Sequence, residues 1–175
     1  MTKEMLDLFT ADGKPAGITI CRGDEKPQGL YHACSDVWLV NSQGQLLLQL
    51  RDASKPNYPN LWCEAAGGAI QSGETPDAAA ARETLEEIGF TVDFSRGGKV
   101  FEYLGSHSIH HVYLFCQDAD PAMLNLQPSE VSAVRYVFPA ELPAMERAGE
   151  LVPTGYLHQL LQMLPILISA YGKGE

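Results

Sequence analysis

The sequence predicts an α/β protein in which a mixed β-sheet is sandwiched between helices. Three observations predict this fold class: strand-like apolar runs recur along the chain, one capped helix interrupts them, and two helical segments follow at the end. The 175 residues suffice for one domain with a sizeable core. No internal repeat or low-complexity linker divides them. We therefore expect a single domain over residues 1–175, with residues 1–30 as an N-terminal extension of strands.

The expected strands follow one another with turn residues between them. The first two flank a turn at Asp12-Gly13, and SDVWLVNSQGQLLLQL predicts a hairpin that turns at residues 42–44. A loop containing Pro56 and Pro59 leads to a short strand in LWCEAAGG. Further strands are expected in FTVDF, KVFEYLGS, IHHVYLFCQ and SAVRYVF.

Three helices are expected, and the first has clear end signals. Thr75 is a favourable N-cap, Pro76 suits the first helical position, and Gly89 ends the helix after Ile88. The other two lie in PAELPAMERAGE and YLHQLLQMLPILISAYG. In the last of these Pro165 predicts a break, and its apolar stretch is too short to span a membrane.

The first helix gathers acidic residues at its C-terminal end. At about 100° per residue, Glu83, Glu86 and Glu87 share an arc of roughly 100°. Their charges oppose the helix dipole and repel one another, and a divalent cation would reverse both costs. Clustered oxygen ligands favour Mg²⁺, with Mn²⁺ as a substitute, and these ions accompany phosphate substrates.

The competing interpretation of this helix is a solvated acidic face with one salt bridge. Arg82 stands four residues before Glu86 and can restrain that carboxylate or reach back to Glu74. In either case we expect the opposite side of the helix to pack on the sheet through Ala78, Ala81, Leu85 and Ile88.

The composition excludes several kinds of partner. The formal net charge is −10, whereas binding to a nucleic-acid backbone needs a basic surface, so no nucleic-acid polymer is expected. The four scattered cysteines form no Cys-x-x-Cys pair and are typical of free thiols in a reducing cytoplasm. The first residues lack the apolar core of a signal peptide. We therefore expect a cytoplasmic protein that does not associate with membranes.

Residues 68–90 resemble the Nudix box, G-x5-E-x7-R-E-U-x-E-E-x-G-U, where U is a bulky apolar residue. Thr84 is the one departure, because the family usually has an aliphatic residue there. We expect it to pack through its methyl group. The fixed positions of the motif are filled by Gly68, Glu74, Arg82, Glu83, Glu86, Glu87, Gly89 and Phe90.

The resemblance extends beyond the box, although more loosely. Residues 31–62 look like the N-terminal half of the Nudix branch that includes isopentenyl-diphosphate isomerase and its hydrolase relatives. SEVSAVRYVFPAEL looks like the last strand and following helix of many Nudix domains. The resemblance implies an α/β/α sandwich that hydrolyses a diphosphate linked to another moiety, usually with Mg²⁺. The expected substrate is a small molecule, such as a nucleoside diphosphate derivative.

Two chemistries occur in that branch, and particular positions favour hydrolysis over isomerisation. Where the isomerases carry a catalytic Cys and a metal-binding His, this sequence has Gly67 and Ala69. His32 matches one further isomerase metal ligand, but a second would fall near Glu25. A third alternative, a non-catalytic module that senses a ligand, is disfavoured because such modules usually lose glutamates of the box.

The resemblance also assigns roles to residues. Glu83, Glu86 and Glu87 would bind the metal together with the main-chain carbonyl of Gly67, and a metal-activated water would attack phosphorus. Glu74 and Arg82 would orient the acidic residues. The general base would be Glu83 or a carboxylate outside the box. The further candidates at the substrate are Arg51, Lys55 and Glu130.

Several questions stay open at this stage. The roles of the histidines are undecided, although neighbouring strand residues His110 and His111 must face opposite sides of the sheet. His107 flanks the same strand. The sequence leaves open a homodimer, the number of metal ions and the phosphorus that is attacked.

Overall fold

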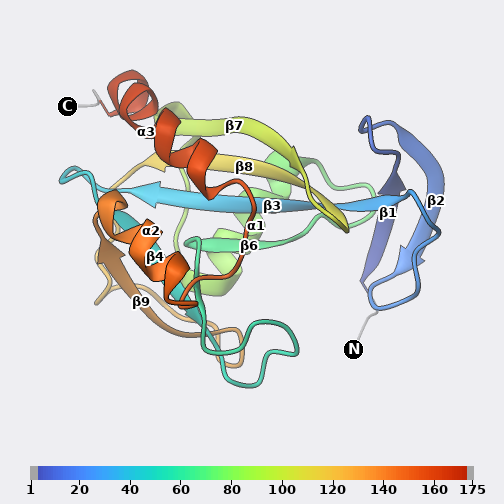
Figure 1. Ribbon diagram of the computed structural model, residues 1–175, viewed down its shortest axis with the longest axis horizontal. Helices are drawn as coiled ribbons and strands as arrows, with labels where there is room; N and C mark the ends of the chain where they lie inside the picture. The colour runs from blue at the N-terminus through green and yellow to red at the C-terminus, as the bar shows by residue number, and fades with distance from the viewer. Residues whose placement is uncertain (1–3, 173–175) are drawn as a thin grey trace.

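The computed structural model describes residues 4–172, in which helices cover both faces of a mixed sheet (Figure 1). The three α-helices are α1 (Pro76–Ile88), α2 (Leu142–Arg147) and α3 (Leu157–Tyr171), and the short 3₁₀ turns are η1 (Phe94–Arg96) and η2 (Pro139–Glu141). The strands are β1 (Met5–Phe9), β2 (Pro15–Cys21), β3 (Tyr31–Val40), β4 (Leu46–Arg51), β5 (Trp62–Cys63), β6 (Ala66–Ala69), β7 (Gly97–Leu104), β8 (Ser108–Cys116) and β9 (Val131–Val137). The predicted fold class is confirmed.

Strand β3 organises the sheet. One edge of β3 pairs in parallel with β8 from His32 to Val40, and β8 pairs in turn with β7. The other edge is shared along its length by β1, β6 and β4, all antiparallel to it. Strand β4 continues the sheet to β9 and β5. Strand β6 thus lies against the middle of β3, and helix α1 packs on β6.

The core is divided by the sheet into two layers. Alternate residues of a strand point to opposite faces, so Trp38 and Val40 pack toward α2 and α3 whereas Val37 and Leu39 pack toward α1. Leu160 is fully buried in the first layer and Ile88 in the second. Among residues 4–172, no helix combines the length and apolar character needed to cross a membrane.

Helix α1 begins and ends where the sequence predicts. The Thr75 hydroxyl accepts a hydrogen bond from Ala78 N at 3.2 Å, which caps the first turn. Gly89 ends the helix in the left-handed conformation, with φ of 68°, and its N–H donates to Leu85 O. These local signals depend on few neighbours, and they were therefore predictable.

The buried side of α1 differs from the expected one. Ala78 is exposed and Leu85 is 56% exposed, so the predicted core stripe is wrong at both positions. The Glu87 carboxylate faces the sheet and bonds the backbone of β6, and this rotation turns Leu85 toward solvent. The residues that α1 buries are Ala79, Ala80, Thr84, Glu87 and Ile88.

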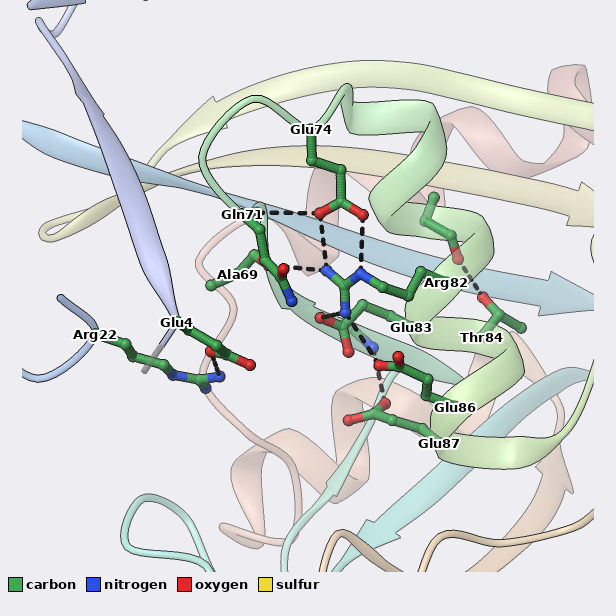
Figure 2. Close-up of polar contacts among 12 residues, drawn as sticks. Glu4, Arg22, Ala69, Gln71, Glu74, Arg82, Glu83, Thr84, Glu86 and Glu87 are labelled. Carbon is green, nitrogen blue, oxygen red and sulfur yellow. Dashed lines mark hydrogen bonds and ion pairs between the residues drawn. The ribbon is translucent and has the colours of Figure 1, made fainter. Parts of the chain in front are cut away.

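Thr84, the departure from the box motif, is fully buried. Its hydroxyl donates a hydrogen bond of 2.7 Å to Ala80 O in the preceding turn (Figure 2). The polar group is therefore satisfied inside the core, as a buried hydroxyl requires.

Three other expectations are corrected. The segment FTVDF contains no strand, because the Asp93 carboxylate accepts from Ser95 N and starts the turn η1 instead. The segment LWCEAAGG forms two strands, β5 and β6, rather than one. Helix α3 continues through Pro165 without the predicted break; this proline lies on an exposed side of the helix.

Candidate functional site

One guanidinium group joins the acidic residues of α1 to the loop before it. Arg82 donates to the two carboxylate oxygens of Glu74 at 2.8 and 2.9 Å. Its Nη1 also bonds Glu83 at 2.8 Å and Glu86 at 3.1 Å, as Figure 2 shows. The same guanidinium donates to the carbonyl of Ala69 at 3.3 Å. Arg82 thereby fixes the loop, the helix and the end of β6 to one another.

Glu83 and Glu87 lie against two glycines of β6. A Cβ atom on Gly68 would stand 2.2 Å from Glu83 Oε1, so only a residue without a side chain fits beneath that carboxylate. Glu87 is 6% exposed and accepts hydrogen bonds from Gly67 N at 3.0 Å and Gln49 Nε2 at 2.9 Å. Gly67 therefore contacts Glu87 through its N–H, and the role of its carbonyl as a metal ligand stays a prediction.

Burial changes the proton affinity of both carboxyl groups. Removal from water raises the pKa of Glu87 to about 7, because the two neutral hydrogen-bond donors only partly offset the lost hydration. Burial also raises the pKa of Glu83, although the nearby Arg82 opposes this shift. Burial thus makes the neighbouring carboxyl groups of Glu83 and Glu87 harder to ionise, and a bound cation would favour their charged forms.

These glutamates form one wall of a pocket of about 140 Å³, here called the glutamate pocket. Three cationic side chains besides Arg82 line the same pocket. Arg51 donates to Asn57 O at 3.0 and 3.2 Å, Lys55 pairs with Glu130, and Arg22 pairs with Glu4 at 2.6 Å. The lining includes the following site residues predicted from the sequence: Arg51, Lys55, Gly67, Arg82, Glu83, Glu86, Glu87 and Glu130. Glu74 lies behind Arg82 and does not line this pocket.

The donor set suits a hard divalent cation. The ligands available are carboxylate oxygens, and the glycine pair leaves room for an ion close to the backbone. As they stand, no three His, Cys, Asp or Glu side chains within residues 4–172 are arranged to hold a metal ion. Arg82 Nη1 occupies an oxygen of Glu83 and of Glu86, so joint ligation requires these side chains to rotate away from it.

The structure adds residues that the sequence interpretation missed. The N-terminal hairpin β1–β2 brings Arg22 to the glutamate pocket, and β4 supplies Gln49. A second group comes from apolar strands: Asp36 is 5% exposed, and its Oδ2 accepts from Tyr156 OH at 2.7 Å and lies 2.8 Å from His110 Nδ1. The sequence signal for Asp36 was a charged residue directly before the apolar run at residues 37–40.

The histidines occupy different environments. His110 and His111 face opposite sides of β8, the first toward Asp36 and the second toward Glu102 at 3.2 Å. His32 contacts Lys26 at 2.9 Å, and burial together with this cation lowers the pKa of His32 to about 4. The carbonyl of His107 accepts a hydrogen bond from Lys26.

The raised carboxyl pKa values predict that the metal-free protein loses stability as pH rises from about 6.5 to about 8. Glu64 lies between β5 and β6, and burial raises its pKa to about 8. In the folded protein Glu87 and Glu64 therefore hold protons up to about pH 7 and about pH 8, whereas unfolded glutamates lose them near 4.5. The folded state therefore binds more protons in this window. His32, whose lowered pKa favours the folded state as pH rises, opposes this loss through a single proton, and its effect fades above about pH 6.5.

Urea unfolding in EDTA at several pH values measures this effect. Glu87→Gln and Glu64→Gln should each flatten the pH dependence, because an amide does not titrate. A free energy of unfolding that increases from pH 6.5 to 8 would contradict the shifts.

The fold and the site together define a class of protein. It is an α/β/α sandwich in which helix α1 carries glutamates that bond Arg82. This helix packs on the two glycines of β6, and further cationic side chains line the same pocket. A family model described as the NUDIX domain matches residues 30–155. The chain belongs to the Nudix family, and it is a hydrolase acting on the anhydride bonds of phosphorus compounds.

The relatives include a Nudix hydrolase and an isopentenyl-diphosphate isomerase. An uncharacterised Nudix hydrolase of Listeria monocytogenes is 34% identical over 91% of this chain and 95% of the relative. An isopentenyl-diphosphate Δ-isomerase of Nocardia farcinica is 31% identical over 95% of each chain. The crystal structure of DR0079 from Deinococcus radiodurans superimposes with a TM-score of 0.76 and 30% identity, covering 91% of this chain and 98% of the other.

Proposed function

We propose that the protein is a Mg²⁺-dependent diphosphohydrolase that cleaves the diphosphate bond of a nucleoside diphosphate derivative or a related metabolite. The observation that carries this proposal is the pair of carboxyl groups Glu83 and Glu87, held against Gly67 and Gly68 in a pocket that arginine and lysine side chains also line. Glu87 is buried with only neutral hydrogen-bond donors, which favours a metal ion beside it, and the arginine and lysine side chains favour phosphate oxygens.

Different residues of the pocket would bind the metal ion, contact the phosphate groups and accept the proton. Glu83, Glu86 and Glu87 would hold the ion, which would supply charge neutralisation and acidify the attacking water. Arg51 and Lys55, which line the pocket, would contact phosphate oxygens, with Lys55 exchanging its pairing with Glu130. Water adds to phosphorus, the bridging P–O bond breaks, and a carboxylate takes the proton of the water. Glu83 and Glu130 are the candidates for this base, since both line the pocket.

The runner-up activity is isomerisation of isopentenyl diphosphate, which the similarity to the Nocardia farcinica isomerase brings into consideration. Gly67 and Ala69 stand beside the glutamates on β6 and offer neither a thiol nor an imidazole. The two positions at which the isomerases carry a catalytic Cys and a metal-binding His therefore have no reactive side chain, so hydrolysis is the better-supported activity.

A screen of diphosphate compounds with Mg²⁺ or Mn²⁺ tests the proposal. Nucleoside diphosphates, nucleoside diphosphate sugars and isopentenyl diphosphate are incubated with the protein, and released phosphate and monophosphates are measured by chromatography. Turnover should require the metal and stop in EDTA. Tight binding without turnover would indicate a sensing module instead, and formation of dimethylallyl diphosphate would indicate an isomerase.

A further inference from the structure

A serine, a histidine and an aspartate of β3 and β8 form one chain of hydrogen bonds. Ser108 Oγ lies 2.8 Å from His110 Nε2, and His110 Nδ1 lies 2.8 Å from Asp36 Oδ2. An ionised carboxyl group only accepts hydrogen bonds, so Nδ1 carries the imidazole proton and Nε2 is left to accept the hydrogen of the serine hydroxyl. In this arrangement an imidazole base, oriented by a carboxylate, activates a serine hydroxyl as a nucleophile.

The parallel pairing of β3 with β8 brings the three side chains together (Figure 1). Cys34 lies beside His110 in this ladder, and Asp36 follows Cys34 by two residues. Alternate residues of a strand share a face, so Asp36 projects to the same side as His110. Ser108 precedes His110 by two residues on β8 and shares that face as well. Regular strands therefore hold all three groups, and this fixes their relative positions.

Exposure to solvent differs between the two ends of this chain of hydrogen bonds. Asp36 is buried, and its Oδ2 also accepts from the hydroxyl of the buried Tyr156 at 2.7 Å, which restrains the carboxylate. The His110 side chain is 23% exposed, and Ser108 is partly exposed. The orienting carboxylate is thus closed to solvent while the hydroxyl is accessible, as a reaction at Ser108 requires.

A cleft of about 550 Å³ lies beside His110 and gives a substrate access to this part of the sheet. Lys26 lines the same cleft; its Nζ lies 2.9 Å from His32 Nδ1 and bonds the carbonyl of His107, the residue before Ser108. A positive charge there would stabilise the negative oxygen that forms when a hydroxyl adds to a carbonyl group. The hydrocarbon part of a substrate would meet the apolar residues of the lining, among them Leu6, Ile20 and Pro56.

We propose that Ser108, His110 and Asp36 form a second hydrolytic site, which cleaves small carboxylic esters without a metal ion. The serine oxygen adds to the ester carbonyl while its proton passes to His110 Nε2. The C–O bond to the alcohol then breaks, the alcohol takes that proton, and the acyl group stays on Ser108. Water attacks the acyl-serine in the same two steps, with His110 again moving the proton, and releases the carboxylic acid.

This site is separate from the glutamates of α1. Ser108, His110 and Asp36 do not line the glutamate pocket, and the proposed ester cleavage uses no group of that pocket. Asp36 acts as a positioning residue, because it holds the imidazole proton on Nδ1 and does not touch the substrate. The ester activity should therefore persist in EDTA, where metal-dependent hydrolysis of a diphosphate stops.

A fluorophosphonate probe tests the nucleophile directly. Diisopropyl fluorophosphate is incubated with the full chain in EDTA. The serine oxygen should replace fluoride at phosphorus, with its proton leaving through His110, and peptide mass spectrometry should locate the added group on Ser108. Ser108→Ala should lose this label. Ser106→Ala is the matched control, because Ser106 is an exposed serine of the same β7–β8 connection, and this variant should be labelled like the unchanged protein.

Hydrolysis of para-nitrophenyl acetate in EDTA measures the activity itself. Ser108→Ala and His110→Gln should each lower kcat/KM by about 10²-fold or more, whereas Ser106→Ala should keep it. Thermal unfolding of each variant confirms that the fold is kept. Nitrogen NMR of the neutral His110 imidazole should show its proton on Nδ1, where Asp36 accepts it.

Three results would each overturn the inference. The first is failure of the probe to label Ser108, and the second is ester cleavage by folded Ser108→Ala as fast as by the unchanged protein. The third is an imidazole proton on Nε2 of His110, since that nitrogen could not then act as the base. None of these measurements uses a diphosphate, so failure of the diphosphate screen would reject the proposed function alone.

Discussion

Replacement of Glu87 by Gln should lower hydrolysis by about 10²- to 10⁴-fold while the protein stays folded. Glu87 is buried, and its Oε2 accepts from both Gly67 N and Gln49 Nε2. The amide oxygen of Gln can keep these two bonds, so the packing of α1 on β6 should survive. What the substitution removes is the negative charge that a divalent cation requires.

Steady-state kinetics with Mg²⁺ on the substrate found by the diphosphate screen measures this loss. Urea unfolding should show that Glu87→Gln is at least as stable as the unchanged protein at pH 8 in EDTA, because a neutral amide carries no charge into the core. Glu146→Gln, an exposed substitution on α2, is the control. Near-normal turnover by the folded variant would remove Glu87 from the metal site.

The substitution Gly68→Ala should lower kcat/KM by about 10²-fold through a single added methyl group. The φ of Gly68 is not positive, so alanine is compatible with the backbone of β6. The new Cβ would stand 2.2 Å from Glu83 Oε1, which is far inside van der Waals contact. The Glu83 carboxylate must move away from Gly68.

Gly98→Ala provides a matched control for this effect. Gly98 also lies in a strand, β7, without a positive φ, and a Cβ atom there meets no atom within 4 Å. Gly98→Ala should therefore keep normal activity and stability. A crystal structure of Gly68→Ala should show the Glu83 carboxylate displaced while β6 stays paired with β3. If Gly68→Ala retains normal kcat/KM, the position of Glu83 does not limit the reaction.

Local chemistry made part of this protein predictable. Thr75 and Gly89 define the ends of α1 through bonds to the nearest turn of backbone, which any surrounding fold would permit. The spacing of the box likewise determined that Glu83 and Glu87 would lie on neighbouring turns. The Asp12-Gly13 turn and the turn at residues 42–44 were correct for the same reason, because turn residues act over a few bonds.

Hydrogen bonds of individual side chains decided which face of α1 is buried and where a 3₁₀ turn replaces the predicted strand. Hydrophobicity alone assigned Leu85 to the core, but α1 buries Glu87 in preference, because this carboxylate finds two donors on β4 and β6. In the same way Asp93 caps a 3₁₀ turn where its neighbours favoured a strand. The donors to Glu87 lie on distant strands, whereas Asp93 bonds Ser95 two residues along the chain; in both cases a side-chain hydrogen bond outweighed propensity.

The sequence by itself determined the family, the glutamate helix and the type of chemistry, because these follow from residue spacing along one helix and its loop. Only the tertiary structure brought Arg22, Asp36 and Glu64 to the two sides of β6, since their partners lie on strands distant in the chain. The burial that leaves Glu64 a neutral acid is likewise a property of the packed sheet, and it arises from dehydration that no single segment can produce.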